Sequence, residues 1–487
     1  MRYTLQEMSR PHPRFDTILE REQGLHRGLS TGQISMIAIG GAIGTGLFLG
    51  SGFAIGFAGP SVLVSYAVGA LIALLLMGCL AEMTVAHPTS GSFGAWAEFY
   101  ISPLAGFLVR YAYWAAIVFA VGTEVTAIAV YMRYWYPAVP GWLWIVGFSA
   151  ALITINAIDV RLFGAVEYCF SALKIVAILA FIVLGAWIVF TATRSSGIGF
   201  VNYTRFGGFF PKGAWGTWVG VIVALFSYFS IEMIAVAAGE ARDPQHAITR
   251  AFRATIGRLI FFYLLTLALI LAIVPWTVAR TDESPFVKVM AATHVPGAAG
   301  VINFVILVAA LSAMNSQLYI TTRMMFSLSR AGYAPRRFGR LTKRGVPAAA
   351  LLLSTIGIAL AAILNAMYSN ASFIIMMSIA MFGAMFAWLM IFVTHLFFRR
   401  RHADAAPGFR MWGYPYTTLA GAVLMAATLV TTVFTREFRM TLVCGIPFLL
   451  ALSIIFLLRL RRPGSGHAGW TAEPAVAPAY NKEQVSS

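Results

Sequence analysis

The chain alternates between long apolar runs and short polar segments. A helix that spans a membrane needs about 20 mostly apolar residues. Twelve runs reach that length, near residues 32–57, 61–86, 104–136, 141–158, 163–192, 214–239, 250–277, 297–329, 346–366, 371–398, 414–435 and 439–460. The pattern predicts an all-α integral membrane protein with twelve transmembrane helices.

The polar segments divide the chain into five parts. We expect a cytoplasmic N-terminal segment at 1–30, spans 1 to 10 as one core at 31–398, a cytoplasmic loop at 399–413, spans 11 and 12 at 414–460, and a disordered cytoplasmic tail at 461–487. The first segment lacks the short apolar region and cleavage site of a signal peptide. The first span itself is therefore expected to direct insertion.

Composition excludes several classes of protein. Of 487 residues, 59% are apolar and 11% are charged, whereas soluble domains average about 25% charged residues. A soluble globular protein, a disordered chain and a nucleic-acid binder are thereby excluded. With both termini inside, 25 of the 35 Lys and Arg residues lie on the inner side and 8 on the outer side. This bias follows the positive-inside rule and predicts cytoplasmic termini.

Two spans carry sequences that interrupt a helix. Span 1 reads GGAIGTG at Gly40–Gly46, and span 6 reads FSYFSIE at Phe226–Glu232. Glycines also serve close helix packing in membranes, but four in seven residues favour an unwound segment that lines a cavity. Interrupted spans at matching places in two halves indicate the binding site of a transporter. At such a break, the N-terminus of a half-helix attracts a carboxylate, and unwound backbone carbonyls accept hydrogen bonds from an ammonium. An amino acid carries both of these groups, so it suits such a site.

These and other motifs resemble the amino acid–polyamine–organocation (APC) superfamily, and most closely its bacterial amino acid transporter branch of aromatic, proline, GABA and lysine permeases. The resemblance covers about residues 24–460. It rests on ordered motifs, namely Gly28-Leu29, Ile39–Phe48, Ala58-Gly59-Pro60, Gly91-Ser92-Phe93, Tyr134-Trp135 with Pro137, Gly239–Pro244, Asn303-Phe304, Asn315-Ser316 and Arg344–Pro347. The chain departs from the pattern at Thr321-Thr322-Arg323 and at Ala115-Ala116.

The resemblance implies a LeuT-like fold, in which ten spans form a five-plus-five inverted repeat and two C-terminal helices follow. It also implies a substrate site at the two breaks. In span 1, Gly44, Thr45 and Gly46 would hold the substrate carboxylate, and the carbonyls of Ala42 and Ile43 would face the ammonium. Side chains at Gly44 or Gly46 would block that approach. In span 6 the matching residues are Phe226, as a lid, together with Ser227 and Phe229.

Ionisable residues inside a membrane are functional candidates because they are costly to bury. Lys174 lies near the middle of span 5 and matches a lysine that replaces sodium in proton-coupled relatives. Glu232 is a second candidate for proton coupling or a structural carboxyl. Glu124 can bind a substrate ammonium, hold a proton or pair with another residue. Arg110, near one end of span 3, is expected to reach the interface by extending its side chain.

The favoured function is a secondary active transporter that imports an L-amino acid by alternating access and proton symport, with a neutral or aromatic substrate. The alternative function is an amino acid exchanger or a cationic amino acid permease. A multi-span membrane enzyme, a channel and a sensor are the other classes considered, and the sequence favours them much less. Because the eight His residues are dispersed, we expect no metal, no cofactor and no catalytic residue. The expected partners are the amino acid, the proton and membrane lipid, with no nucleic acid, for a monomer or weak oligomer in the bacterial inner membrane.

Overall fold

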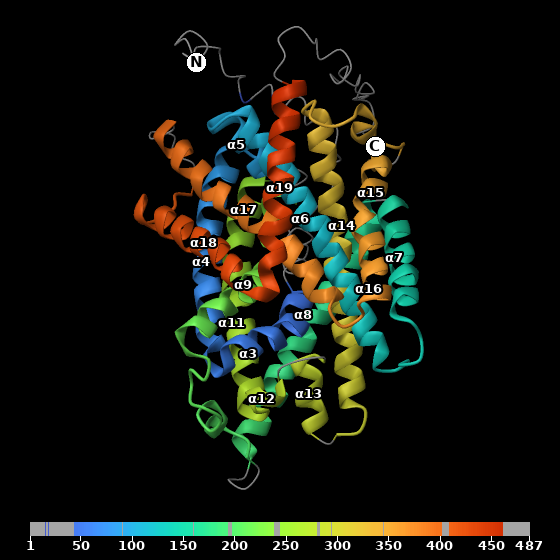
Figure 1. Cartoon of the computed structure of the whole chain (residues 1–487), viewed down its shortest axis with the longest axis vertical. Coiled ribbons are helices and arrows are strands. Elements are labelled where there is room, and N and C mark those ends of the chain that lie inside the picture. The colour runs from blue at the N-terminus through green and yellow to red at the C-terminus, as the bar shows by residue number, and fades with distance from the viewer. Residues whose placement is uncertain are drawn as a thin grey trace, which may run out of the picture.

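The computed structural model contains only helices and irregular connections in the part of the chain that it describes. The structure describes residues 15, 18, 43–89, 91–158, 160–192, 197–237, 244–279, 283–293, 295–343, 345–401 and 409–460. The long helices are α4 (Val62–Ala86), α6 (Pro103–Arg133), α7 (Gly141–Ile158), α8 (Val160–Thr191), α9 (Gly213–Tyr228), α11 (Pro244–Ile273), α14 (Ala298–Arg330), α17 (Ser372–Arg401), α18 (Tyr416–Phe434) and α19 (Arg439–Ile455). Most of the long helices run along the long axis of the molecule, whereas α18 lies obliquely at its side (Figure 1).

Shorter helices complete or connect the long ones. They are η2 (Gly46–Gly50), α3 (Ser51–Ala58), η3 (Gly59–Ser61), α5 (Ser92–Tyr100), η5 (Phe200–Tyr203), α10 (Met233–Ala237), α12 (Trp276–Ala279), α13 (Pro285–Ala292), η7 (Arg336–Gly339), α15 (Ala348–Ser354), α16 (Ile356–Met367), η8 (Arg436–Phe438) and η9 (Phe456–Leu460). In Figure 1, α5 lies at one end of the molecule, and α12 and α13 lie at the other. Between α5 and α12 the chain crosses the molecule through α6, α7, α8, the pair α9 and α10, and α11. This odd number of crossings agrees with the placement of α5 and α12 at opposite ends of the molecule.

The all-helical membrane architecture predicted from the sequence is confirmed. The described residues contain 10 helical stretches that are long and apolar enough to cross a membrane. One of them, Gly46–Ala86, joins η2, α3 and α4, which the sequence assigns to two spans. The seventh predicted span corresponds to α11, with a shorter apolar part at Ile260–Ile273. The count of twelve stays a prediction, because residues 32–42 of the first span lie outside the described residues.

The sixth span is interrupted where the sequence predicts. Helix α9 ends at Tyr228 and α10 begins at Met233, so four residues between them are not helical. Ser230 adopts a φ of 82° there, a backbone shape that costs free energy for a residue other than glycine. Span 1 is also irregular, since Ile43 and Gly44 lie outside any helix and η2 is a π-helical turn. Such turns are frequent at functional sites.

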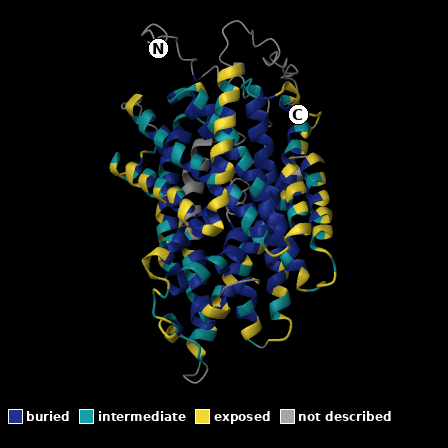
Figure 2. Ribbon diagram, viewed as in Figure 1, coloured by how far each residue is buried: buried dark blue, intermediate teal, exposed yellow. Residues whose placement is uncertain are grey.

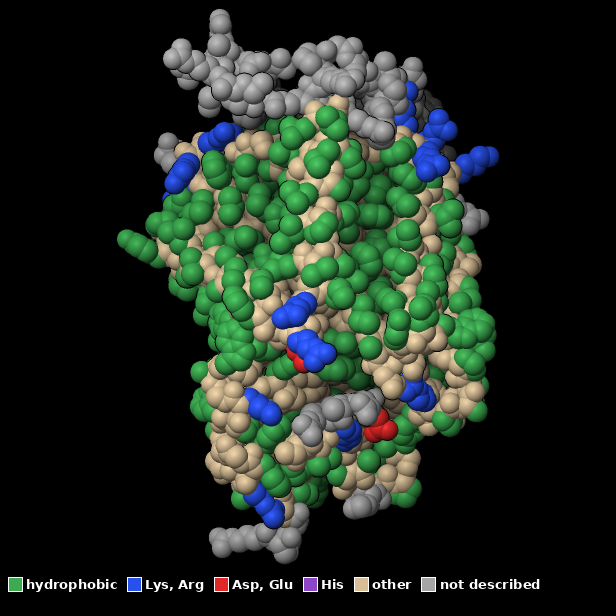
Figure 3. Space-filling model, in the orientation of Figure 1, with side chains coloured by type: hydrophobic (Ala, Val, Ile, Leu, Met, Phe, Trp, Pro, Cys, Tyr) green, Lys and Arg blue, Asp and Glu red, His purple; other side chains and the backbone are tan. Residues whose placement is uncertain are grey.

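The buried centre is formed by α6, α9 and α14, whereas outer helices expose apolar side chains (Figure 2). Phe190 and Trp187 of α8 are 82% and 68% exposed. Hydrophobic side chains cover the upper half of the face drawn in Figure 3, whereas Lys and Arg lie at its upper margin and at several places from its centre downward. A broad apolar surface of this kind matches lipid rather than water.

Arg110 does not extend to the interface, so that prediction is wrong. The side chain is fully buried and forms an ion pair with Glu98 of α5. The hydroxyl of Tyr333 donates to the other oxygen of Glu98 at 3.2 Å. The reason is that α5 folds back against α6 and brings a carboxylate to the arginine, which neutralises its charge inside the protein.

Close helix packing around α6 depends on glycine. A Cβ atom on Gly383 of α17 would collide with the carbonyl oxygen of Ala112 in α6. Because backbone atoms cannot rotate away, Gly383→Ala is expected to destabilise the protein by about 1–3 kcal/mol. Gly147→Ala on α7 is the matched control, since nothing lies within 4 Å of its added methyl group. Thermal unfolding in detergent measures both, and equal stability of the two variants would contradict the packing argument.

Candidate functional site

The break in span 1 presents a backbone amide to a buried carboxylate. The Thr45 amide donates to Glu124 Oε2 of α6 at 3.2 Å. Thr45 and Glu124 are 1% and 2% exposed. The Thr45 hydroxyl is also buried, and it makes no hydrogen bond within the described part of the chain. The segment thus presents a backbone amide and a hydroxyl at the positive end of a helix, which suits an anion.

Lys174 of α8 also reaches the irregular segment of span 1. Its Nζ donates to the carbonyl oxygen of Ile43 at 3.0 Å, and the side chain is fully buried. Lys174 also interacts electrostatically with Glu167 and Glu124. The lysine therefore links α8 to the irregular backbone of span 1 and interacts with two carboxylates.

Gly44 and Gly46 have no room for a side chain. A Cβ atom on Gly44 would lie 2.7 Å from Glu124 Oε1 and 2.8 Å from the Cβ of Ala313. On Gly46 it would lie 2.7 Å from the Cα of Ser227. The sequence argument required glycine so that a substrate could approach. The structure gives a second reason, because both glycines pack against other parts of the protein.

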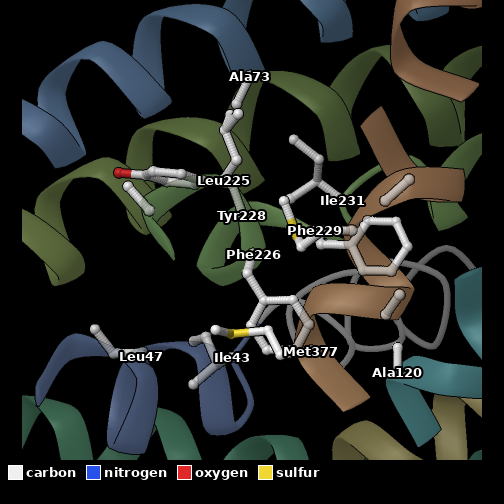
Figure 4. Packing of buried hydrophobic residues seen from close by; sticks show 14 of the residues in the cluster. Ile43, Leu47, Ala73, Ala120, Leu225, Phe226, Tyr228, Phe229, Ile231 and Met377 are labelled. Atoms are coloured by element: carbon white, nitrogen blue, oxygen red, sulfur yellow. The ribbon is translucent and has the colours of Figure 1, made fainter. Parts of the chain in front are cut away.

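The side chains of the predicted site residues in span 6 point in two different directions. Phe226 points toward Ile43 and Met377, whereas Phe229 points away from them (Figure 4). The backbone of Ser227 faces Gly46, and its hydroxyl shares a hydrogen bond of 2.8 Å with the hydroxyl of Tyr66 in α4. Phe226 thus contributes its ring to the neighbourhood of the span 1 break, and Ser227 contributes its backbone.

Glu232 and Phe229 belong to a second group of residues. The hydroxyl of Tyr113 in α6 donates to Glu232 Oε1 at 2.6 Å. The ring of Phe229 packs near the rings of Tyr113 and Trp388, with centroids 6.1 and 6.5 Å away. Phe229 and Trp388 also line a small apolar cavity between α9, α17 and α18. Glu232 is therefore a buried carboxyl held by a tyrosine, at the last position of the break.

The structure brings most of the predicted site residues together. Around the span 1 break lie Ile43, Gly44, Thr45, Gly46, Glu124, Lys174, Phe226 and the backbone of Ser227. Ala42 lies outside the described residues. Sequence reasoning missed Glu167, a second carboxylate that interacts with Lys174, and Tyr66, the partner of Ser227. Glu167 could have been found, because a spacing of seven residues places it on the same helix face as Lys174.

The sequence model of the family described as amino acid permease matches residues 33–464. The chain belongs to the amino acid permease family. It is 37% identical over 424 residues to the gamma-aminobutyric acid permease of Bacillus subtilis (strain 168), covering 86% of this chain and 90% of that one. It is 36% identical over 413 residues to the aromatic amino acid transport protein AroP of Salmonella typhimurium (strain SL1344), covering 84% of this chain and 90% of that one.

A solved structure shares the fold. The manganese transporter of Eremococcus coleocola superposes with a TM-score of 0.57 at 16% sequence identity, covering 92% of this chain and 95% of that chain. Family membership and the apolar helices together make the chain a multi-pass membrane protein of amino acid transport. Its relatives are named as permeases and transport proteins, which fits a transporter rather than an enzyme.

Proposed function

We propose that this permease imports an L-amino acid by proton symport and alternating access, as a monomer or weak oligomer in the bacterial inner membrane with both termini in the cytoplasm. The observation that carries the proposal is the contact of Lys174 with the Ile43 carbonyl, at the break that would hold the substrate. A residue that can gain or lose a proton is thereby joined to the backbone of the binding segment. Proton and substrate then act on the same structural element, which is what coupling requires.

The binding segment suits the two charges of an amino acid. The amides of Gly44, Thr45 and Gly46 would receive the carboxylate, and the Ile43 carbonyl would receive the ammonium. The Thr45 amide donates to Glu124 in this structure. A substrate carboxylate would compete with Glu124 for that donor, and two carboxylates side by side favour the protonation of one. Glu124 therefore offers a second way in which substrate and proton can be linked.

The side chains near the break favour a neutral or aromatic substrate. Ile43, Phe226 and Met377 lie together and are apolar (Figure 4). A cationic amino acid is the second candidate, because the Glu124 carboxylate is buried beside Gly44 and could pair with a cationic side chain. The relatives include a permease named for gamma-aminobutyric acid and one named for aromatic amino acids.

The proposal is tested with the purified protein in proteoliposomes. Uptake of each of the twenty labelled amino acids is measured with and without an imposed pH gradient, acid outside. We expect accumulation of a neutral or aromatic amino acid that requires the gradient. Exchange of internal for external substrate with no effect of the gradient would show an exchanger, and preference for Lys or Arg would show the cationic alternative.

Glu124→Gln tests the role of the carboxylate at the break. Glutamine keeps an acceptor for the Thr45 amide but cannot take up a proton or carry a charge. We expect transport to persist with an altered pH optimum or an altered ranking of substrates. Uptake measured across pH for several amino acids checks this, with the exposed Glu437→Gln as control. An unchanged profile at every pH would leave Glu124 a structural residue.

A further inference from the structure

Gln317 of α14 is a buried amide whose two ends have different surroundings. The residue is 2% exposed. Its side chain forms a hydrogen bond with the Glu124 carboxylate, whereas its Oε1 atom has no hydrogen-bond partner within the described part of the chain. A buried acceptor left unpaired costs about 1–3 kcal/mol, and most buried polar atoms in proteins are therefore paired. The Gln317 oxygen thus indicates a partner that the described chain does not itself provide.

The orientation of the Gln317 amide follows from its neighbour. An ionised carboxylate only accepts hydrogen bonds, so Gln317 presents its NH2 group to Glu124. Turning the amide over would place acceptor oxygens of the two side chains against each other, and these repel. The Oε1 atom is bonded to the same carbon as the NH2 group, so it also lies close to Glu124. Gln317 is therefore an uncharged acceptor that Glu124 holds in a fixed orientation.

The position of Gln317 on α14 places it at the span 1 break. Ala313, four residues earlier, faces Gly44, since a Cβ atom on Gly44 would lie 2.8 Å from the Cβ of Ala313. Residues four apart share one face of a helix, so Gln317 lies one turn further along this face. Glu124 Oε1 would lie 2.7 Å from the same added Cβ atom. Helices α6 and α14 therefore meet at Gly44, and the Gln317 amide lies beside this meeting point.

A second group without a partner lies at the same place. The Thr45 amide donates to Glu124 Oε2 at 3.2 Å, and the Thr45 hydroxyl makes no hydrogen bond to any described residue. One carboxylate is thus contacted by two residues that each retain an unused hydrogen-bonding atom. A hydroxyl can donate to a carboxylate, and an amide oxygen accepts from an ammonium. The unused atoms of Thr45 and Gln317 therefore match the two ends of an amino acid.

A neighbouring amide on α14 shows the contrast. Asn315 donates from Nδ2 to Glu167 Oε2 at 3.0 Å, and its Oδ1 atom accepts from Asn156 of α7 at 2.8 Å. Both ends of the Asn315 amide are thus paired by contacts between helices. Two residues further along, the Gln317 amide is paired at one end only. The difference separates an amide that joins helices from one that keeps an acceptor available.

We propose that Gln317 is a substrate-binding residue, whose Oε1 atom accepts a hydrogen bond from the ammonium of the transported amino acid. The inference rests on the amino acid transport proposed above and extends the binding site to α14. The Ile43 carbonyl already accepts from Lys174 at 3.0 Å. An ammonium has three N–H donors, so the remaining lone pair of that carbonyl does not satisfy it. Gln317 adds an acceptor that recognises N–H groups rather than charge.

Gln317→Met tests the contact, because methionine has a similar length but lacks both polar atoms of the amide. We expect its affinity for the transported amino acid to fall by about tenfold. For the analogue with hydrogen in place of the α-ammonium, we expect wild-type affinity. Competition against labelled substrate in detergent measures both compounds. Equal losses for the two compounds, or wild-type affinity for the amino acid, would overturn the proposal.

Thr321→Val is the matched control. Thr321 is buried one turn further along the same helix face, and its hydroxyl donates only to the Gln317 and Leu318 carbonyls of α14 among the described residues. We expect wild-type affinity for both compounds. A loss equal to that in Gln317→Met would overturn the proposal, because any polar deletion on this face would then weaken binding. Gln317→Leu replaces Gln317→Met if the methionine variant does not fold.

A double variant separates direct contact from an effect through Glu124. Glu124→Gln removes the charge that Gln317 would otherwise hold in place. If Gln317 contacts the ammonium itself, adding Gln317→Met to Glu124→Gln lowers affinity for the amino acid by about tenfold again. No further loss in that background would show that Gln317 acts only through Glu124, and the proposal would fall.

Wild-type protein separates this inference from the proposed function. If the wild type binds none of the twenty amino acids, the proposed import fails and the role of Gln317 fails with it. If the wild type binds an amino acid and Gln317→Met binds it equally well, the proposed import stands and only the role of Gln317 fails.

Discussion

Protein with alanine in place of Lys174 is expected to bind and exchange its substrate but not to accumulate it against a gradient. The substitution removes the hydrogen bond from Nζ to the Ile43 carbonyl. It also removes a cation that interacts electrostatically with both Glu124 and Glu167. When charged, the lysine can hold α8 against span 1, and when neutral it can release it. Without it, the proton no longer acts on the binding segment.

Three variants make this test specific. Lys174→Arg keeps a charge that cannot be lost, so we expect binding without proton-driven accumulation. Lys212→Ala removes an exposed lysine and should behave as wild type. The accumulation ratio of labelled substrate is expected to fall in Lys174→Ala by about tenfold or more, to the level set by exchange alone. Accumulation by Lys174→Ala with acid outside would exclude the lysine from coupling.

The membrane fold follows from the sequence because lipid imposes one rule on every span. Backbone groups must be satisfied within the helix, so each run of about 20 apolar residues is a helix. The interruption after Tyr228 is also readable, since Ser230 and Glu232 break the apolar pattern there. The pairing of span 1 with span 6 is visible as the contact between Gly46 and Ser227.

The partners of the buried charges do not follow from the sequence in the same way. The ion pair of Arg110 with Glu98 depends on α5 folding back against α6, a turn that hydropathy does not report. Glu167 lies in an apolar run, and its donors Ser312 and Asn315 come from a helix more than 140 residues away in the chain. Such distant partners are set by tertiary packing, which a single sequence does not encode in any local pattern.

The same limit explains the two reasons for glycine at the span 1 break. Local sequence indicates that the backbone there must be free to bind a ligand. It does not indicate that α9 lies against it. In the structure, the Gly46 Cα faces backbone atoms of Ser227 and Phe226. Substrate contact and helix packing thus meet at one residue, and a substitution there acts on both.

Gly46→Ala is accordingly expected to lose substrate binding while the protein remains folded in the membrane. The added Cβ would lie 2.7 Å from the Cα of Ser227 and 3.1 Å from the carbonyl oxygen of Phe226, so the broken segment must move away from α9. Strain of this kind costs about 1–3 kcal/mol, which corresponds to about tenfold or more in affinity. Gly50→Ala in the same π-helical turn is the matched control, because its nearest neighbours are 3.5 Å away. Binding measured by thermal shift with saturating substrate separates the two, and wild-type affinity in Gly46→Ala would remove this segment from the site.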